Sequence, residues 1–134
     1  MKFARANQAV TRQGRMDQLR RNRSTAQALR AAFPSVDRLR IELRFEGPFT
    51  NTPTAQCHML YPPAPAFFGY PCPYADCDGH FDLGEAVRAA VADGSKVSAG
   101  MLECRGSRAR DHAWKQPCLL QLIYEITATC HEKT

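Results

Sequence analysis

The chain has 134 residues, of which 44% are hydrophobic, and its formal net charge at pH 7 is +5. This length suits one ordinary domain, or a smaller domain with an extended arm. No stretch approaches the roughly 18 consecutive apolar residues of a membrane span, so we expect no membrane contact.

The charge divides the chain into a basic arm and a nearly neutral body. Residues 1–33 carry eight basic side chains against one acidic side chain, a net charge of +7. Residues 34–134 carry ten basic and twelve acidic side chains, a net charge of −2. We therefore predict two parts, a basic and partly helical arm over residues 1–33 and a folded domain over residues 34–134.

A helix is expected in the second half of the arm. Ser24 and Gln27 have the spacing of a capping box, which places a helix N-terminus at Ser24. Leu29 and Phe33 follow at helical spacing. Pro34 then ends the helix, because the residue before a proline disfavours helical backbone.

Alternation of apolar and charged residues predicts strands at the start of the domain. Residues 39–46 alternate strictly, as in a strand with one buried and one charged face. Residues 56–61 are predicted to form a second strand, antiparallel to the first. Residues 62–73 contain five prolines and are expected to run extended over the core without regular structure.

The remaining elements complete an α+β pattern. Asp82 and Glu85 have capping-box spacing and predict a short helix that Gly94 closes. Residues 97–103 and 120–128 are predicted strands, and residues 106–116 a charged loop. The fold class is therefore α+β, a small antiparallel sheet with an inserted short helix and an N-terminal basic helical arm.

Four of the six cysteines lie at or beside chain-reversal signals: Cys72, Cys77, Cys104 and Cys118. Two of them precede a glycine by two residues, at Gly79 and Gly106, and such a glycine lets backbone N–H groups point at a thiolate sulfur. Zn²⁺ prefers four soft ligands arranged as a tetrahedron. We predict one structural zinc ion held by these four cysteines.

Other roles for cysteine and histidine remain open at this point. Six cysteines can form three disulfides in a secreted domain, but residues 1–33 contain no apolar run of signal-peptide length. We therefore expect a reducing, cytoplasmic location, which favours metal over disulfides. Cys57 and Cys130 are interpreted as small core residues. His58 and His80 are reserve metal ligands.

The cysteine turns resemble those of zinc ribbons, in which two cysteine-bearing turns at the ends of β-hairpins clamp one zinc ion. The resemblance covers roughly residues 70–128 and is carried by Cys72-Pro73, Cys77-Asp78-Gly79, Cys104-Arg105-Gly106 and Cys118. The chain departs from the ribbon pattern in its wider first turn, its inserted helix and the charged excursion within its second turn. The resemblance implies a module that binds nucleic acid or docks in transcription or translation machinery.

The charge of the arm favours nucleic acid or a ribonucleoprotein as the partner, because arginine neutralises phosphate. The residues expected to make this contact are Arg12, Arg15, Arg20, Arg21, Arg23 and Arg30. A solvated basic face is the alternative interpretation. Arg108, Arg110 and Lys115, beside Trp114, form a second basic segment that can add a stacking contact.

Two other functional classes are a protein-docking adaptor and an enzyme. A protein-docking adaptor would use the stripe formed by Leu29 and Phe33, together with the proline and aromatic segment at residues 62–70. An enzyme is not expected, because four cysteine ligands leave a zinc ion no open position for water and no catalytic motif is present. No small-molecule substrate is expected either.

Overall fold

The computed structural model describes residues 12–47, 55–92, 97–109 and 115–131. The helices are α1 (Arg12–Thr25), α2 (Leu29–Ala32) and α3 (Gly84–Ala92). The strands are β1 (Val36–Glu46), β2 (Ala55–Leu60), β3 (Gly69–Pro71), β4 (His80–Asp82), β5 (Val97–Glu103), β6 (Ser107–Ala109), β7 (Lys115–Pro117) and β8 (Gln121–Cys130). The α+β class is confirmed. Within the described parts of the chain, no helix is long and apolar enough to cross a membrane.

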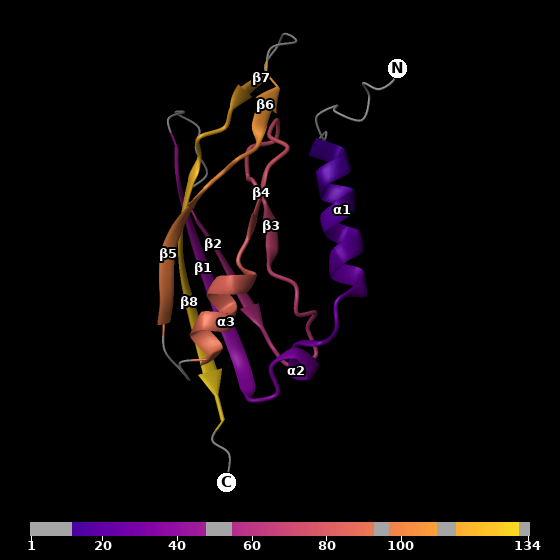
Figure 1. Ribbon diagram of the computed structural model, residues 1–134, viewed down its shortest axis with the longest axis vertical. Coiled ribbons are helices and arrows are strands. Elements are labelled where there is room, and N and C mark those ends of the chain that lie inside the picture. The colour runs from indigo at the N-terminus through magenta and orange to yellow at the C-terminus, as the bar shows by residue number, and fades with distance from the viewer. Residues whose placement is uncertain (1–11, 48–54, 93–96, 110–114, 132–134) are drawn as a thin grey trace.

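A four-stranded antiparallel sheet forms the centre of the molecule, in the order β2-β1-β8-β5 (Figure 1). Its register pairs Ile41 with Ile126 and Leu43 with Tyr124. The alternation predicted for residues 39–46 is confirmed, because one set of side chains is buried and the other is not. The buried set of β1 consists of Val36, Leu39, Ile41, Leu43 and Phe45.

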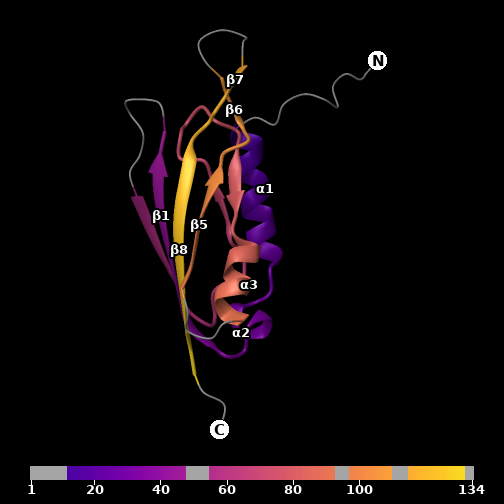
Figure 2. The same ribbon diagram turned by 60° about the vertical axis from the view of Figure 1, so that its left-hand side comes forward.

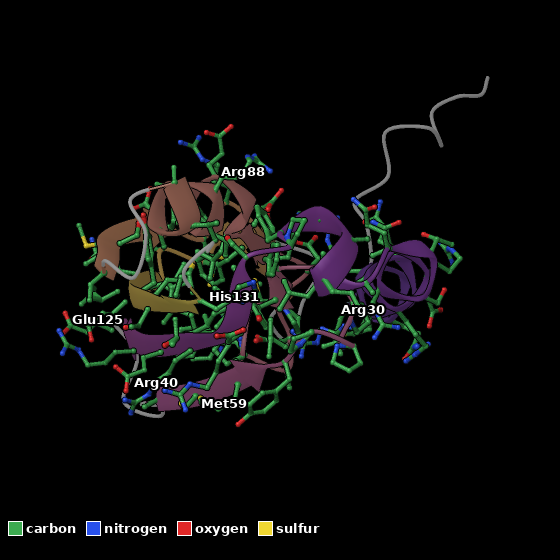
Figure 3. All side chains as sticks on the ribbon, turned by 90° about the horizontal axis from the view of Figure 1, so that it is seen from below. Arg30, Arg40, Met59, Arg88, Glu125 and His131 are labelled. Carbon is green, nitrogen blue, oxygen red and sulfur yellow. The ribbon has the colours of Figure 1, made fainter. Side chains whose placement is uncertain are left out.

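All three helices and the β3–β4 hairpin lie on one side of this sheet (Figure 2). Val87 and Ala90 of α3 are buried in the core that forms there. The carboxylate of Asp82 accepts a hydrogen bond of 2.9 Å from the backbone N–H of Gly84, so Asp82 stabilises the start of α3 as its position predicts. The opposite face of the sheet carries exposed side chains, among them Arg40, Met59 and Glu125 (Figure 3).

The predicted helix start at Ser24 is wrong, because α1 continues through this residue to Thr25. The hydroxyl group of Ser24 donates a hydrogen bond of 2.8 Å back to the carbonyl oxygen of Arg21, so it closes one helix rather than capping another. The shorter α2 begins at Leu29 without a side-chain cap. Its first N–H instead donates to the carbonyl oxygen of Ala64 at 2.7 Å, which fastens α2 to the proline-rich segment.

Two short hairpins are present where the sequence predicted irregular chain. Residues 62–73 end in β3, which pairs with β4. Residues 106–116 contain β6 and most of β7, which pair with each other. Each of these strands has only three residues, too few to show a period of two. The hairpins matter because they carry the cysteine turns.

Candidate metal centre

Four cysteine sulfurs meet in one buried cluster. The Sγ atoms of Cys72, Cys77, Cys104 and Cys118 all lie within 4.8 Å of one another. Cys72 and Cys118 are 3.7 Å apart at sulfur, and Cys77 and Cys104 are 3.6 Å apart. A tetrahedral ion with metal–sulfur bonds of about 2.3 Å separates its sulfur ligands by about 3.8 Å. The four thiols can therefore hold a metal ion with little rearrangement.

The two hairpins supply the sulfurs in matching ways. Cys72 follows β3 and Cys77 precedes β4, whereas Cys104 follows β5 and Cys118 follows β7. The N–H of Cys72 donates to the carbonyl oxygen of Gly79 at 3.0 Å, and the N–H of Cys118 donates to that of Gly106 at the same distance. Each turn thus closes onto a glycine that lies two residues beyond a cysteine of the cluster.

The same two glycines donate hydrogen bonds to sulfur, as their spacing predicts. The N–H of Gly79 lies 3.3 Å from the Sγ atom of Cys77, and the N–H of Gly106 lies 3.4 Å from that of Cys104. Such donors stabilise the negative charge of a thiolate, which is the form that binds metal.

Close backbone contact between the two turns requires glycine at both positions. A Cβ atom added to Gly106 would overlap the Cα and N atoms of Gly79, and one added to Gly79 would overlap the sulfur of Cys104. Backbone atoms cannot move aside as a flexible side chain can. The two turns therefore approach closely enough to share one ion only because neither glycine has a side chain.

The buried thiols also alter one another's acidity. Hydrogen bonds from Cys104, with further contributions from other thiols of the cluster, lower the pKa of Cys77 and of Cys118. Hydrogen bonding to Cys104 raises the pKa of Cys72, and hydrogen bonding to Cys118 raises the pKa of Cys104. The thiolate form, which binds a cation, is thus favoured at Cys77 and Cys118 relative to Cys72 and Cys104.

Helix α1 supports the first cysteine turn from outside. The guanidinium group of Arg12 donates to the carbonyl oxygen of Cys72 and, at 3.4 Å, to that of Cys77. The Nε atom of Arg15 donates to the carbonyl oxygen of Asp78 at 2.8 Å. Both arginines are among those predicted to contact nucleic acid, and their bonds to the cysteine turn were not predicted. Their spacing from the buried Leu19, which places all three on one face of α1, is the signal that could have revealed that they face inward.

Side chains from the two turns join them to each other. The carboxylate of Asp78 accepts a hydrogen bond of 2.8 Å from the N–H of Ser107. Arg108 bonds the carboxylate of Asp76 at 2.8 Å and lies 4.0 Å from the centre of the Tyr74 ring. Arg108 is therefore part of the support of the metal centre. The predicted second basic segment also included Arg110, Trp114 and Lys115. The first two residues and the side chain of the third lie outside the described part of the chain.

The other four arginines predicted to contact nucleic acid have exposed side chains: Arg20, Arg21, Arg23 and Arg30. Arg20 forms an ion pair of 2.8 Å with Asp17 on the surface of α1. Arg23 lies 5.3 Å from the centre of the Phe67 ring. In the described part of the chain, no carboxylate is within ion-pair distance of Arg21, Arg23 or Arg30.

The remaining cysteines and the reserve histidines lie elsewhere. Cys57 is exposed, so its predicted place in the core is wrong. It pairs with Glu42 across β1 and β2, and the outward face of the sheet explains its exposure. Cys130 is half-buried and packs against the core. Neither His58, which stacks on Tyr70 at 4.6 Å, nor His80 belongs to the described sulfur cluster.

Comparison of the chain with family models, with curated proteins and with solved structures gave no match. The likeness to zinc ribbons therefore rests on the cluster of four buried cysteines alone.

Proposed function

We propose that this protein is a non-catalytic zinc-binding module that contacts nucleic acid or a ribonucleoprotein through the exposed face of α1. The observation that carries the metal assignment is the sulfur–sulfur spacing of 3.6–3.7 Å within a fully buried set of four thiols. A tetrahedral set of four thiolates suits zinc, and also iron. When bound, zinc would cross-link the two hairpins, and its four protein ligands would leave no position for a reactive water.

The metal assignment is tested by elemental analysis of protein purified without chelator. We expect one zinc ion per chain, and iron in its place would refute the choice of metal. Cys77→Ser should lose the ion and much of the fold, because structural zinc binding contributes roughly 10 kcal/mol or more to folding. Cys57→Ser is the matched control, since Cys57 is exposed and distant from the cluster in sequence. Equal zinc content in the two variants would contradict the assigned ligands.

The charge distribution of α1 supports the nucleic-acid part of the proposal. Arg12 and Arg15 are directed at the cysteine turn, so they orient the helix, while Arg20, Arg21 and Arg23 are exposed along it. Exposed guanidinium groups around a helix that is held in place by the domain can neutralise several phosphates at a small entropic cost. Release of the counterions from those phosphates would make the affinity strongly dependent on salt.

The experiment compares two double variants that lose the same charge from different faces. Arg21→Gln with Arg23→Gln removes two charges from α1, and Arg40→Gln with Arg44→Gln removes two from the outer face of the sheet. Binding of a fluorescent oligonucleotide is measured between 50 and 200 mM salt, a range over which phosphate contacts weaken steeply. We expect the slope of log affinity against log salt concentration to become shallower by up to about two units in the α1 variant. The sheet variant should keep the slope of the wild-type protein. Equal losses would reject α1 as the contact surface.

The apolar stripe required by the adaptor alternative is occupied within the chain itself. Leu29 is fully buried, and Phe33 packs against Phe68 with 6.3 Å between ring centres. Leu29 and Phe33, which were predicted to dock on a partner, therefore pack on the protein's own core, and no observation favours a second function.

A further inference from the structure

We propose that a groove between α1 and α3 binds one nucleotide unit of a single-stranded nucleic acid, with its base against phenylalanine side chains and its phosphate near Arg88. This inference rests on the proposed function and specifies the form of nucleic acid that the protein prefers.

The groove has a volume of about 350 Å³ and is bordered by α1, α2, β4 and the start of α3. This volume lies at the lower end of the range for small-ligand pockets, about 300–1,000 Å³, and suits a single planar base with its sugar. A base-paired duplex is too wide to enter such a groove, whereas an unpaired base can turn into it.

Aromatic side chains line the groove. Phe33, Phe67 and Phe68 all contribute to its wall. Phe67 is half-buried, and a Cβ atom on Gly69 would lie 2.8 Å from the Cζ atom of its ring, so the tip of the ring packs close to the backbone of Gly69. Bases of any sequence stack favourably on aromatic rings, which is the usual basis of single-strand binding.

Two side-chain amides face the same space from the α1 side. Asn22 and Gln27 line the groove and are exposed to solvent. Within the described residues, neither amide group is bonded to another side chain. Each offers a hydrogen-bond donor and an acceptor, the combination that the edge of an unpaired base requires.

The groove wall offers a phosphate one guanidinium group, that of Arg88, and it also carries the carboxylate of Asp82. Arg88 lies at the α3 wall, and its pairing with the exposed Glu85 is long, at 3.6 Å. Asp82 also lines the groove and keeps its negative charge while its carboxylate accepts the N–H of Gly84, so a phosphate is expected on the side of Arg88 and away from Asp82. Arg23 stands next to Asn22 in the sequence of α1 and close to Phe67. A strand bound along the arginines of α1 can therefore place one base in the groove and the next phosphate near Arg88.

The test uses fluorescence anisotropy with a ten-nucleotide single strand of mixed sequence and with its duplex, each made as DNA and as RNA. We expect the wild-type protein to bind the single strand about tenfold more tightly than the duplex. Phe67→Leu should lose about tenfold in single-strand affinity, the scale of one base–aromatic stack, with the duplex unaffected. Asn22→Ala should weaken single-strand binding a few-fold, and Gln56→Ala, an exposed amide on β2, should not. The DNA and RNA arms identify which sugar is accepted.

Two outcomes separate this inference from the proposed function. If single strands bind Phe67→Leu and Asn22→Ala as they bind wild type, while the α1 arginine variant is weakened, the groove is refuted and the arginine contact stands. If the wild-type protein binds no polynucleotide, both fall. Zinc content and thermal unfolding verify the fold of each variant. If Phe67→Leu unfolds, the exposed Asn22→Ala decides. A photo-crosslink from 4-thiouridine is expected in residues 66–69, and a crosslink confined to β1 would overturn the groove.

Discussion

The Nε atom of Arg15 lies 2.8 Å from the backbone carbonyl oxygen of Asp78, which joins α1 directly to the first cysteine turn. Arg12 bonds carbonyl oxygens of the same turn, and Leu19, on the same face of α1, is only 7% exposed. The basic helix is thereby fixed against the metal centre by two arginines and one leucine. Its exposed arginines are held in a defined orientation by the inward-facing ones.

Arg15→Ala should lower the free energy of unfolding by about 1–2 kcal/mol, since it removes a charged donor from a partly buried carbonyl oxygen. Arg21→Ala, which removes an exposed arginine of the same helix, should change it by less than about 0.5 kcal/mol. Urea denaturation with zinc present measures both. Indistinguishable midpoints for the two variants would show that the Arg15 bond adds nothing to stability.

Gly106→Ala should prevent metal binding, because its Cβ atom would overlap the backbone of Gly79 and push the two cysteine turns apart. Gly84→Ala is the matched control. The added Cβ atom there would meet a carboxylate oxygen of Asp82 at 3.2 Å, and that side chain can shift by a few tenths of an ångström. Zinc content after gel filtration is the readout. Full zinc content in Gly106→Ala would disprove the close contact of the turns.

Leu119→Gly should stabilise the protein by about 0.5–1 kcal/mol. Leu119 directly follows Cys118 and has a φ angle of 62°, a left-handed conformation that costs an L-residue about 1–2 kcal/mol. Glycine removes this cost, but it also makes the unfolded chain more flexible, which offsets part of the gain in stability. Leu119 is 51% exposed, so little packing is lost. Leu119→Ala keeps the Cβ atom and should bring no gain. An equal rise in melting temperature for both variants would refute strain as the cause.

Burial raises the pKa of Tyr70 to about 12, from an ordinary value of 10.0. Between these values the unfolded chain loses the phenolic proton while the folded chain keeps it, so stability falls as the pH rises. The contribution is complete below pH 10, and about 2–3 kcal/mol of it is lost by pH 12. Tyr70→Phe should remove this loss. The free energies of unfolding of Tyr70→Phe and wild type, measured from pH 9 to 12, should run parallel near pH 9 and diverge as the pH rises. Curves that stay parallel over the whole range would contradict the raised pKa of Tyr70.

The strands of the four-stranded sheet were predictable from the sequence, whereas the three-residue strands and the true extent of α1 were not. Apolar alternation identified β1 and β8 because each has ten or more residues with one face buried. The strands of the β3–β4 and β6–β7 hairpins have three residues each, too few to show a period of two in the sequence. Ser24 misled because its hydroxyl group can bond backward to Arg21 as readily as forward to a helix N-terminus.

The candidate site was predictable as a set of ligands but not as a structure. Turn residues around Cys72, Cys77, Cys104 and Cys118 identified the sulfur cluster. The contacts of Arg12 and Arg15 depend on where α1 docks. Their helical spacing from Leu19 indicates which face of α1 packs inward, but not which turn that face meets. The exposure of Cys57 likewise follows from its partner in the sheet, Glu42, rather than from its neighbours in sequence.

The position of β8 between β1 and β5 has a consequence for synthesis on the ribosome. The chain between the end of β1 at Glu46 and the start of β8 at Gln121 takes roughly 4–15 s to translate. During that interval β1 cannot pair with β8, so the buried-side residues of β1 stay exposed on the nascent chain and can be bound by chaperones. Cys118 emerges only three residues ahead of β8. If the four cysteines bind a metal ion, its capture and the closure of the sheet would therefore fall in the same late interval, because both need the C-terminal part of the chain.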